Sequence, residues 1–202
     1  MKQSEIMLAG EGDEWFKRNE ANLGKFDPVS AVIEGHKIEP KSVLEIGCAN
    51  GWRLAKLGKQ YGCRVAGIDP SKAAMLASTL VPMMQATAEA LPFEPQSFDM
   101  VIYGFCLYLT DPVDWMKIAA EGDRVLKPGG HLIIHDFFMR HAEPFAVRYK
   151  HRDDSVLSYH YAFKRLWSGT PFYRVLDEGS FGDEMVTVLR KIPVEEAIKV
   201  RP

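Results

Sequence analysis

The sequence contains few cysteines and no long apolar run. Cys48, Cys63 and Cys106 are the only three in 202 residues, and their odd number and wide spacing argue against a disulfide framework or a metal site. No stretch approaches the ~18 apolar residues that a membrane span needs. Residues 1–15 lack the basic start and apolar run of a signal peptide. We therefore expect reduced thiols, no bound metal, no membrane span and a cytoplasmic location.

An excess of charge of one sign is also missing. The formal net charge is −2, which gives no general reason to expect nucleic acid or a membrane surface as partner. The chain has no internal repeat and no low-complexity tract. Its 47% apolar and 26% charged residues are ordinary values for a globular protein. A chain of this length suits one domain, residues 1–202, acting as a monomer or homodimer.

The middle of the chain alternates between strand and helix patterns. Apolar runs predict strands, and helical spacing, an N-cap serine at Ser71 and an Asp111–Pro112 start predict the helices. Gly62 is expected to end the first of these helices. Such alternation implies an α/β, doubly wound, mostly parallel sheet with helices on both faces. The predicted strands are 42–46, 64–68, 83–85, 98–103 and 131–135, and the predicted helices are 52–61, the one that follows Ser71, and 111–125, with a turn at 127–130.

The two ends of the chain read differently from the middle. Residues 14–23 have the pattern of an amphipathic helix. Residues 137–170 are aromatic and basic without clear strand alternation. Residues 172–176 and 185–192 are strand-like, and the glycines between them suit a hairpin return. An antiparallel C-terminal hairpin closing a parallel sheet of seven strands is therefore expected.

A glycine-bearing loop, Glu45-Ile46-Gly47-Cys48-Ala49-Asn50-Gly51, lies between the first strand and the first helix of this pattern. Glycines allow backbone to approach a ligand closely, and such sheets bind ligands at this edge. The alternative is a tight turn with no ligand. The spacing lacks the third glycine of a dinucleotide loop, and the acid Glu45 would repel a pyrophosphate but suit a cationic ligand.

Asp69 ends the second predicted strand, 18 positions after Gly51. A carboxylate there can accept hydrogen bonds from both hydroxyls of a ribose. The alternative is that Asp69 merely caps the helix that follows.

These segments resemble the class I, Rossmann-like, seven-stranded S-adenosylmethionine-dependent methyltransferases. The resemblance covers residues 40–137, and Ala49 replaces the middle glycine of the family's E-x-G-x-G-x-G motif. It implies a helical cap at 1–30, a cofactor-binding core at 40–137, an acceptor-binding segment at 138–170 and closing strands at 171–202.

Three further segments carry the resemblance. The run from Thr87 to Phe93 is similar to the family's D-A-x-x-L-P-F loop around the adenine, with Thr87 in place of aspartate. Residues 97–101 and 124–130 match segments that are structural in the family, and we read Asp99 as structural. The resemblance implies S-adenosylmethionine as cofactor and S-adenosylhomocysteine as product. The residues expected to bind the cofactor are Glu45, Gly47, Cys48, Ala49, Gly51, Asp69, Pro70, Thr87, Ala88, Glu89, Phe105 and Arg18.

Methyl transfer from a sulfonium needs mainly alignment of the reacting atoms, and a hydroxyl acceptor also needs a base. His135, Asp136 and His160 are the candidate catalytic residues, with His141 and His151 as weaker ones. Each has a plain alternative role in packing.

The resemblance implies an enzyme that methylates oxygen or nitrogen of a small molecule. Residues 148–152, which are basic with an aromatic inside, suggest an anionic acceptor; the alternative is a solvated face. Methylation of tRNA or protein, or cofactor binding without turnover, remain alternatives, and the glycine spacing disfavours a nicotinamide oxidoreductase.

Overall fold

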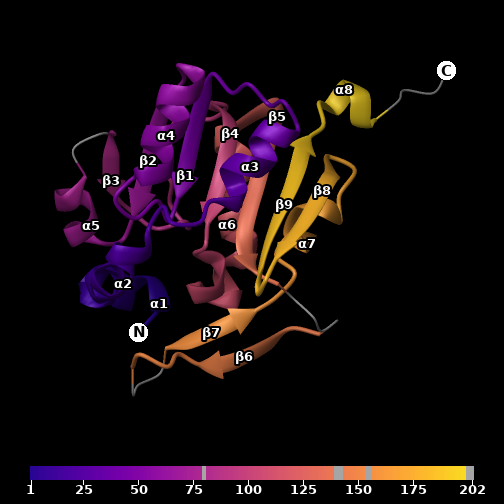
Figure 1. Ribbon diagram of the computed structural model, residues 1–202. Coiled ribbons are helices and arrows are strands. Elements are labelled where there is room, and N and C mark those ends of the chain that lie inside the picture. Colours follow the sequence, from indigo (N-terminus) through magenta and orange to yellow (C-terminus); the bar gives the residue numbers. More distant parts are fainter. Residues whose placement is uncertain (79–80, 139–142, 153–155, 199–202) are drawn as a thin grey trace.

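The computed structural model describes residues 1–78, 81–138, 143–152 and 156–198. Within them, seven strands form one sheet in the order β3-β2-β1-β4-β5-β9-β8 (Figure 1). Strand β9 runs antiparallel between β5 and β8, and the other pairs are parallel. This confirms the predicted mostly parallel sheet with its antiparallel C-terminal hairpin. The strands are β1 Ser42–Ile46, β2 Arg64–Asp69, β3 Met83–Gln85, β4 Phe98–Gly104, β5 Leu126–Phe137, β8 Tyr173–Phe181 and β9 Glu184–Lys191.

Helices cover both faces of the sheet, as the side-chain alternation of β4 requires. Met100 and Ile102 pack into a core with residues of α3 and α4, whereas Val101 and Tyr103 pack with residues of α6 and α7. No helix among the described residues is long and apolar enough to cross a membrane. The helices are α1 Gln3–Ile6, α2 Gly12–Asn19, α3 Pro28–Gly35, α4 Trp52–Tyr61, α5 Lys72–Ala77, α6 Trp115–Val125, α7 Arg165–Ser168 and α8 Val194–Ala197.

Two of the predicted helix boundaries are confirmed and one is confirmed in part. Ser71 caps α5 by accepting a hydrogen bond from the Ala74 amide, and Gly62 ends α4 in the left-handed conformation. A helical segment does begin at Pro112, but its first turn, Pro112–Asp114, is a 3-10 turn without a side-chain cap from Asp111, and α6 itself begins at Trp115. The Asp111 carboxylate instead accepts a hydrogen bond from the Gln3 amide at 2.7 Å.

The turn expected at residues 127–130 is part of β5. The register between β4 and β5 shifts there, since Leu126 pairs with Phe98 and His131 with Met100. Gly129 lies at φ +79 within the irregularity. The Lys-Pro-Gly-Gly sequence therefore makes a bulge in a longer strand rather than a connection.

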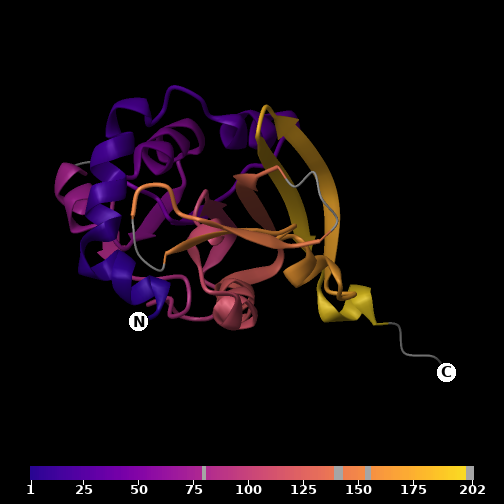
Figure 2. The same cartoon turned by 90° about the horizontal axis from the view of Figure 1, so that it is seen from below.

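The carboxyl edge of the sheet is covered by two segments for which the sequence patterns predicted little regular structure. The N-terminal segment is helical over most of residues 3–22, although Gly10 departs from helical geometry inside it. Residues 137–170 include a separate antiparallel hairpin, β6 Phe145–Arg148 with β7 Leu157–His160. Figures 1 and 2 show this hairpin crossing the edge of the sheet, beside α1 and α2.

Candidate functional site

The loop between β1 and α4 places three residues in left-handed backbone conformations. Gly47, Ala49 and Gly51 have φ values of +75, +48 and +74. A Cβ on Gly47 would lie 2.6 Å from the Cβ of Cys106, and one on Gly51 would collide with Val81. Both glycines are therefore required by the fold itself, whatever the loop binds.

Asp69 is buried at the end of β2 and fixes this loop. Its carboxylate accepts hydrogen bonds from the amides of Ala49, at 2.8 Å, and Ser71, at 2.9 Å. Burial raises the pKa of Asp69 to about 6, against the lowering effect of these two amides. Each carboxylate oxygen keeps a second lone pair, so Asp69 can still accept two hydroxyl groups.

A cavity of about 710 Å³ opens at the carboxyl ends of β1, β2 and β4, under the N-terminal segment. Of the charged residues, Asp69 and Glu89 line it. This volume includes space that is open to solvent. The lining residues are Ser4, Met7, Gly12, Trp15, Ile46, Gly47, Ile68, Asp69, Pro70, Ala86, Thr87, Ala88, Glu89, Gly104, Phe105, Cys106, Leu109 and Thr110.

The expected cofactor residues separate into two groups. Those that line the cavity are Gly47, Asp69, Pro70, Thr87, Ala88, Glu89 and Phe105. Those outside its lining are Glu45, Cys48, Ala49, Gly51 and Arg18.

Glu45 does not present a free charge to the cavity. Its carboxylate forms an ion pair with Arg53, which also donates to Asp27 at 3.0 Å. All three side chains are buried. The expectation that Glu45 would face a cationic ligand overlooked Arg53, which lies eight residues later, in the first turn of α4, and neutralises it.

Arg18 joins the two segments that cover the cavity. Its guanidinium donates to Glu11 at 2.6 Å and to the Tyr149 hydroxyl at 3.2 Å. Gln3 makes a second link, because its side-chain oxygen accepts from the Leu157 amide at 2.6 Å. These contacts hold the N-terminal helices against the hairpin.

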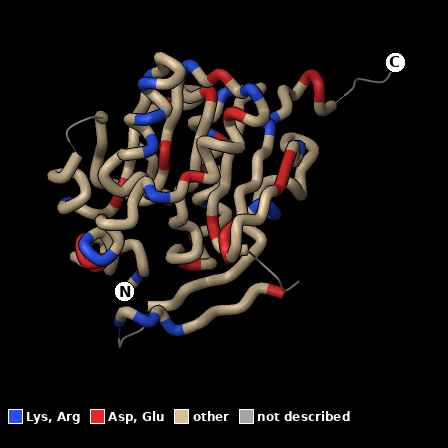
Figure 3. The backbone as a smooth tube through the Cα atoms, in the orientation of Figure 1, with Lys and Arg blue, Asp and Glu red and all other residues tan. Residues whose placement is uncertain are grey.

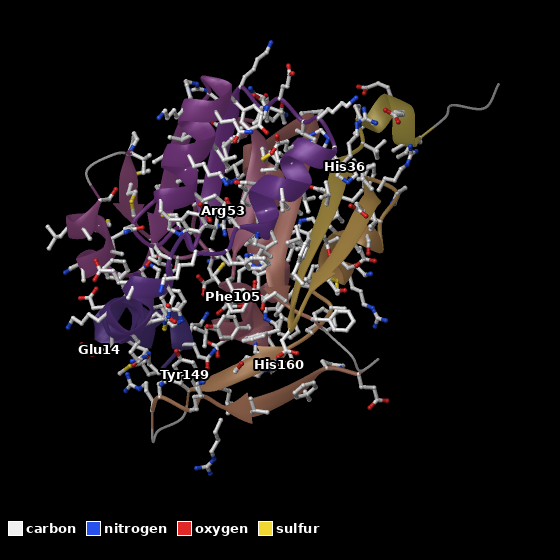
Figure 4. The ribbon with its side chains drawn as sticks, viewed as in Figure 1. Glu14, His36, Arg53, Phe105, Tyr149 and His160 are labelled. Atoms are coloured by element: carbon white, nitrogen blue, oxygen red, sulfur yellow. The ribbon has the colours of Figure 1, made fainter. Side chains whose placement is uncertain are left out.

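Phe105 forms part of the cavity wall in a conformation that is uncommon for a residue with a side chain. Its φ is +57, and its amide donates to the His135 carbonyl at 2.8 Å. Its ring contacts those of His135 and Phe137, at centroid distances of 5.2 and 4.7 Å. In Figure 4, Phe105 lies near the sheet edge, and His160 lies below it on the hairpin.

The candidate bases lie outside the lining of the cavity. The imidazole of His135 pairs with Glu184 at 2.7 Å, and its other nitrogen has no hydrogen-bond partner among the described residues. Asp136 accepts from the amides of Phe137 and Tyr108, at 2.8 and 3.2 Å. Burial raises the pKa of Asp136 to about 7. Its contacts fix the chain around the 3-10 turn after β4.

His160 belongs to the hairpin. It stacks on Phe145 at 4.7 Å and bonds Ser158 at 3.1 Å. Burial lowers the pKa of His160. Of the weaker candidates, His151 packs edge-on against Tyr149, and His141 lies outside the described residues.

Sequence reasoning missed most of the cavity wall supplied by the N-terminal segment. Ser4, Met7 and Gly12 line the cavity beside Trp15. A Cβ on Gly12 would lie 3.2 Å from the Ser71 nitrogen, so this glycine allows close packing rather than breaking a helix. The available signal was the spacing of Ser4, Met7 and Trp15, which suits one face of a helix.

Comparison with known proteins agrees with this geometry. Residues 44–134 match the methyltransferase domain family. An uncharacterised methyltransferase of Synechocystis is 36% identical over 109 residues, which cover 52% of this chain and 51% of that protein. Demethylmenaquinone methyltransferase of Staphylococcus aureus is 33% identical over 133 residues, which cover 54% of each. The chain thus spans about half the length of these curated relatives.

A solved structure shows the same fold over nearly the whole chain. Burkholderia thailandensis 1,6-didemethyltoxoflavin-N1-methyltransferase, with bound 1,6-didemethyltoxoflavin and S-adenosylhomocysteine, superimposes with a TM-score of 0.73. The match covers 94% of this chain and 87% of that one at 17% identity. The strand order, the glycine loop and the family match agree: the chain has the Rossmann-like fold of the class I S-adenosylmethionine-dependent methyltransferases, and its residues 44–134 match the methyltransferase domain.

Proposed function

We propose that this protein transfers the methyl group of S-adenosylmethionine to a nitrogen atom of a small molecule. The observation that carries the proposal is the cavity at the carboxyl edge of the sheet, with Asp69 in its wall. The Burkholderia protein is an N1-methyltransferase of 1,6-didemethyltoxoflavin, which supports this choice of acceptor.

The cavity fits the proposed cofactor. Asp69 has lone pairs free for two ribose hydroxyls after binding the loop amides. Ala88 lies in the wall, and its amide donates no hydrogen bond to any described residue, so it is free for the adenine. Asp69 and Glu89 give the cavity a negative character that suits a sulfonium.

When bound, S-adenosylmethionine supplies a methyl group whose bond to sulfur breaks with the electron pair left on sulfur. The protein's own contribution is to hold the reacting groups in line and to keep water away from them. Trp15, in α2, and Phe105, directly after β4, both line the cavity. Trp15 is held by a hydrogen bond from its indole nitrogen to the Tyr108 hydroxyl at 3.1 Å.

Asp69 and Glu89 are the carboxylates of the wall, and the lack of a histidine or lysine base among its described residues favours nitrogen over oxygen as the atom methylated. No histidine or lysine is among the described residues that line the cavity. Burial raises the pKa of the Cys106 thiol well above its usual range, so it is not a base at neutral pH. A neutral nitrogen attacks through its own lone pair and can lose its proton afterwards, whereas an aliphatic hydroxyl needs a base.

Surface charge gives little support to a nucleic-acid acceptor. In Figure 3 the Lys and Arg positions are interspersed with Asp and Glu, and the net charge of the sequence is −2. Binding to a phosphate backbone would need a broader basic face.

Calorimetric titration with S-adenosylmethionine, S-adenosylhomocysteine and NADH tests the proposal. We expect the two adenosyl ligands to bind and NADH not to bind. Asp69→Ala should weaken their binding at least about tenfold, since hydrogen bonds to a charged group contribute roughly 1.5–3 kcal/mol each. Glu195→Ala, at an exposed position of α8, is the control and should bind normally.

Failure of the folded wild-type protein to bind either adenosyl ligand, or preferential binding of NADH, would refute the proposed cofactor. Binding without release of S-adenosylhomocysteine in the presence of any small amine or heterocycle would favour a non-catalytic binding protein instead.

A further inference from the structure

Glu89 is a buried charge in the cavity wall without a protein partner. Its residue is 8% exposed, and it follows β3 in the loop that lines the cavity. No hydrogen bond or ion pair joins its side chain to any other described residue. The Glu89 oxygens are not among the fully buried side-chain atoms without a partner, so the carboxylate reaches the open space of the cavity, where a ligand can bind it.

The cations nearest this region are already bound to other carboxylates. Lys2 lies close enough for Glu89 to contribute, after Asp114, to raising the pKa of Lys2. Its ammonium is nevertheless held by Asp114 at 2.8 Å. Arg18 is likewise engaged, by Glu11 at 2.6 Å. Lys2 and Arg18 are therefore both paired with carboxylates other than Glu89.

The basic residues that suggested an anionic acceptor do not line the cavity. Arg152 contacts Glu11 at 3.4 Å, and Arg148 lies exposed on β6. An anionic acceptor would enter a cavity whose wall carries two carboxylates, Asp69 and Glu89, and no described Lys, Arg or His. The arrangement disfavours an anion by electrostatic repulsion in a partly desolvated site.

The contacts proposed above for the cofactor do not use Glu89, which the sequence had placed among the cofactor-binding residues. Asp69 accounts for the ribose hydroxyls and the Ala88 amide for the adenine. Glu89 is the remaining charged group of the cavity, beside the apolar wall of Met7, Phe105 and Leu109.

We propose that Glu89 selects the acceptor, an inference that rests on the proposed function. The cavity takes a neutral or cationic, largely apolar nitrogen compound that donates an N–H to Glu89. It excludes anions. The acceptor's N–H or ammonium group binds Glu89, and its apolar body packs on the wall. An ammonium nitrogen has no lone pair, so it gives a proton to Glu89 or to solvent before it attacks the methyl group. Glu89 is thus a specificity-determining residue.

The test uses pairs of probes with the same ring system and opposite charge. Protein saturated with S-adenosylhomocysteine is titrated with benzylamine and benzoate, and with tryptamine and indole-3-propionate. Binding is followed by calorimetry and ligand-observed NMR. We expect at least one amine to bind about tenfold or more tightly than its matched carboxylate. Glu89→Gln should remove most of that preference, while Glu195→Gln, the exposed control, should keep it.

Three results would overturn the proposal: carboxylates that bind as well as the amines, no binding by either amine, or an unchanged preference in a folded Glu89→Gln variant. Loss of S-adenosylhomocysteine binding in Glu89→Gln would also overturn it, by assigning Glu89 to the cofactor. Failure of the proposed function is distinguishable, because wild-type protein would then not bind S-adenosylhomocysteine before any probe is added.

Discussion

Removal of the Arg53 guanidinium should strongly destabilise the fold. Arg53 is 5% exposed and lies between two carboxylates, Glu45 and Asp27, which tie α4 to β1 and to the start of α3 (Figure 4). Arg53→Met would leave the Glu45 charge buried alone, whereas Asp27 would keep Lys56 at 2.8 Å. Breaking a buried pair by removing one partner costs about 3–5 kcal/mol. The melting temperature should therefore fall by roughly 6–20 °C.

Thermal and urea unfolding followed by circular dichroism at pH 7 measures this cost. Lys56→Met is the matched control, because the Lys56 side chain is 50% exposed and its ion pair should contribute less than about 1 kcal/mol. Burial raises the pKa of Glu45 even beside Arg53, and losing Arg53 should raise it further. The folded variant then takes up a proton more readily than the unfolded chain. The loss of stability of Arg53→Met relative to wild type should therefore become smaller as the pH falls towards 5.

Addition of Glu45→Gln to the Arg53→Met variant should recover part of the lost stability at pH 7, since the unpaired charge is removed. A melting temperature of Arg53→Met within about 2 °C of wild type would refute the reasoning. A loss of stability that becomes larger as the pH falls would refute the unpaired Glu45 charge as its cause.

Other predictions concern pH and backbone strain. The raised pKa values of Asp69 and Asp136, about 6 and 7, mean that these groups bind protons more tightly in the folded protein. The free energy of unfolding should therefore rise by about 2 kcal/mol as the pH falls from 8 to 6, from the two groups together. In urea unfolding, the Asp136→Asn variant should show about 1.4 kcal/mol less of this rise than wild type. Gly51→Ala should lower the melting temperature clearly more than Gly129→Ala, although both have positive φ, because only Gly51 faces a colliding side chain; equal losses would contradict this. His135→Phe should keep the rate of methyl transfer within about threefold of wild type, whereas loss of a general base costs about 10²–10⁴-fold.

The parts of the fold that depend on local chemistry were predictable from the sequence. The strand–loop–helix at Gly47–Gly51 and the cap at Ser71 each follow from a few adjacent residues. The hairpin was not predictable in this way, because each of its strands has only four residues, too few for an alternating pattern to be recognised. The neutralisation of Glu45 by Arg53 depends on how α4 returns over β1, which no short motif specifies.

The same division applies to the site. Asp69 and the Thr87–Glu89 wall follow motifs, whereas Ser4 and Met7 reach the cavity only because the N-terminal helices fold back over the sheet edge. Glu89 was assignable to the cavity from the loop motif. Its lack of a partner depends on side chains from distant segments, and it is evident only in the folded chain.

The hydrogen bonds that join the N-terminal helices to the hairpin, here called the clasp, set a rule for building chimeras with related enzymes. Gln3 bonds the backbone of Leu157, and Arg18 bonds Tyr149, so the two covering segments recognise each other across more than 130 positions of sequence. A hairpin transplanted alone from another parent would meet a mismatched helix and lose these bonds. Exchange of residues 3–18 and 145–163 together, as one unit, would keep the clasp and leave Asp69 and the glycine loop untouched.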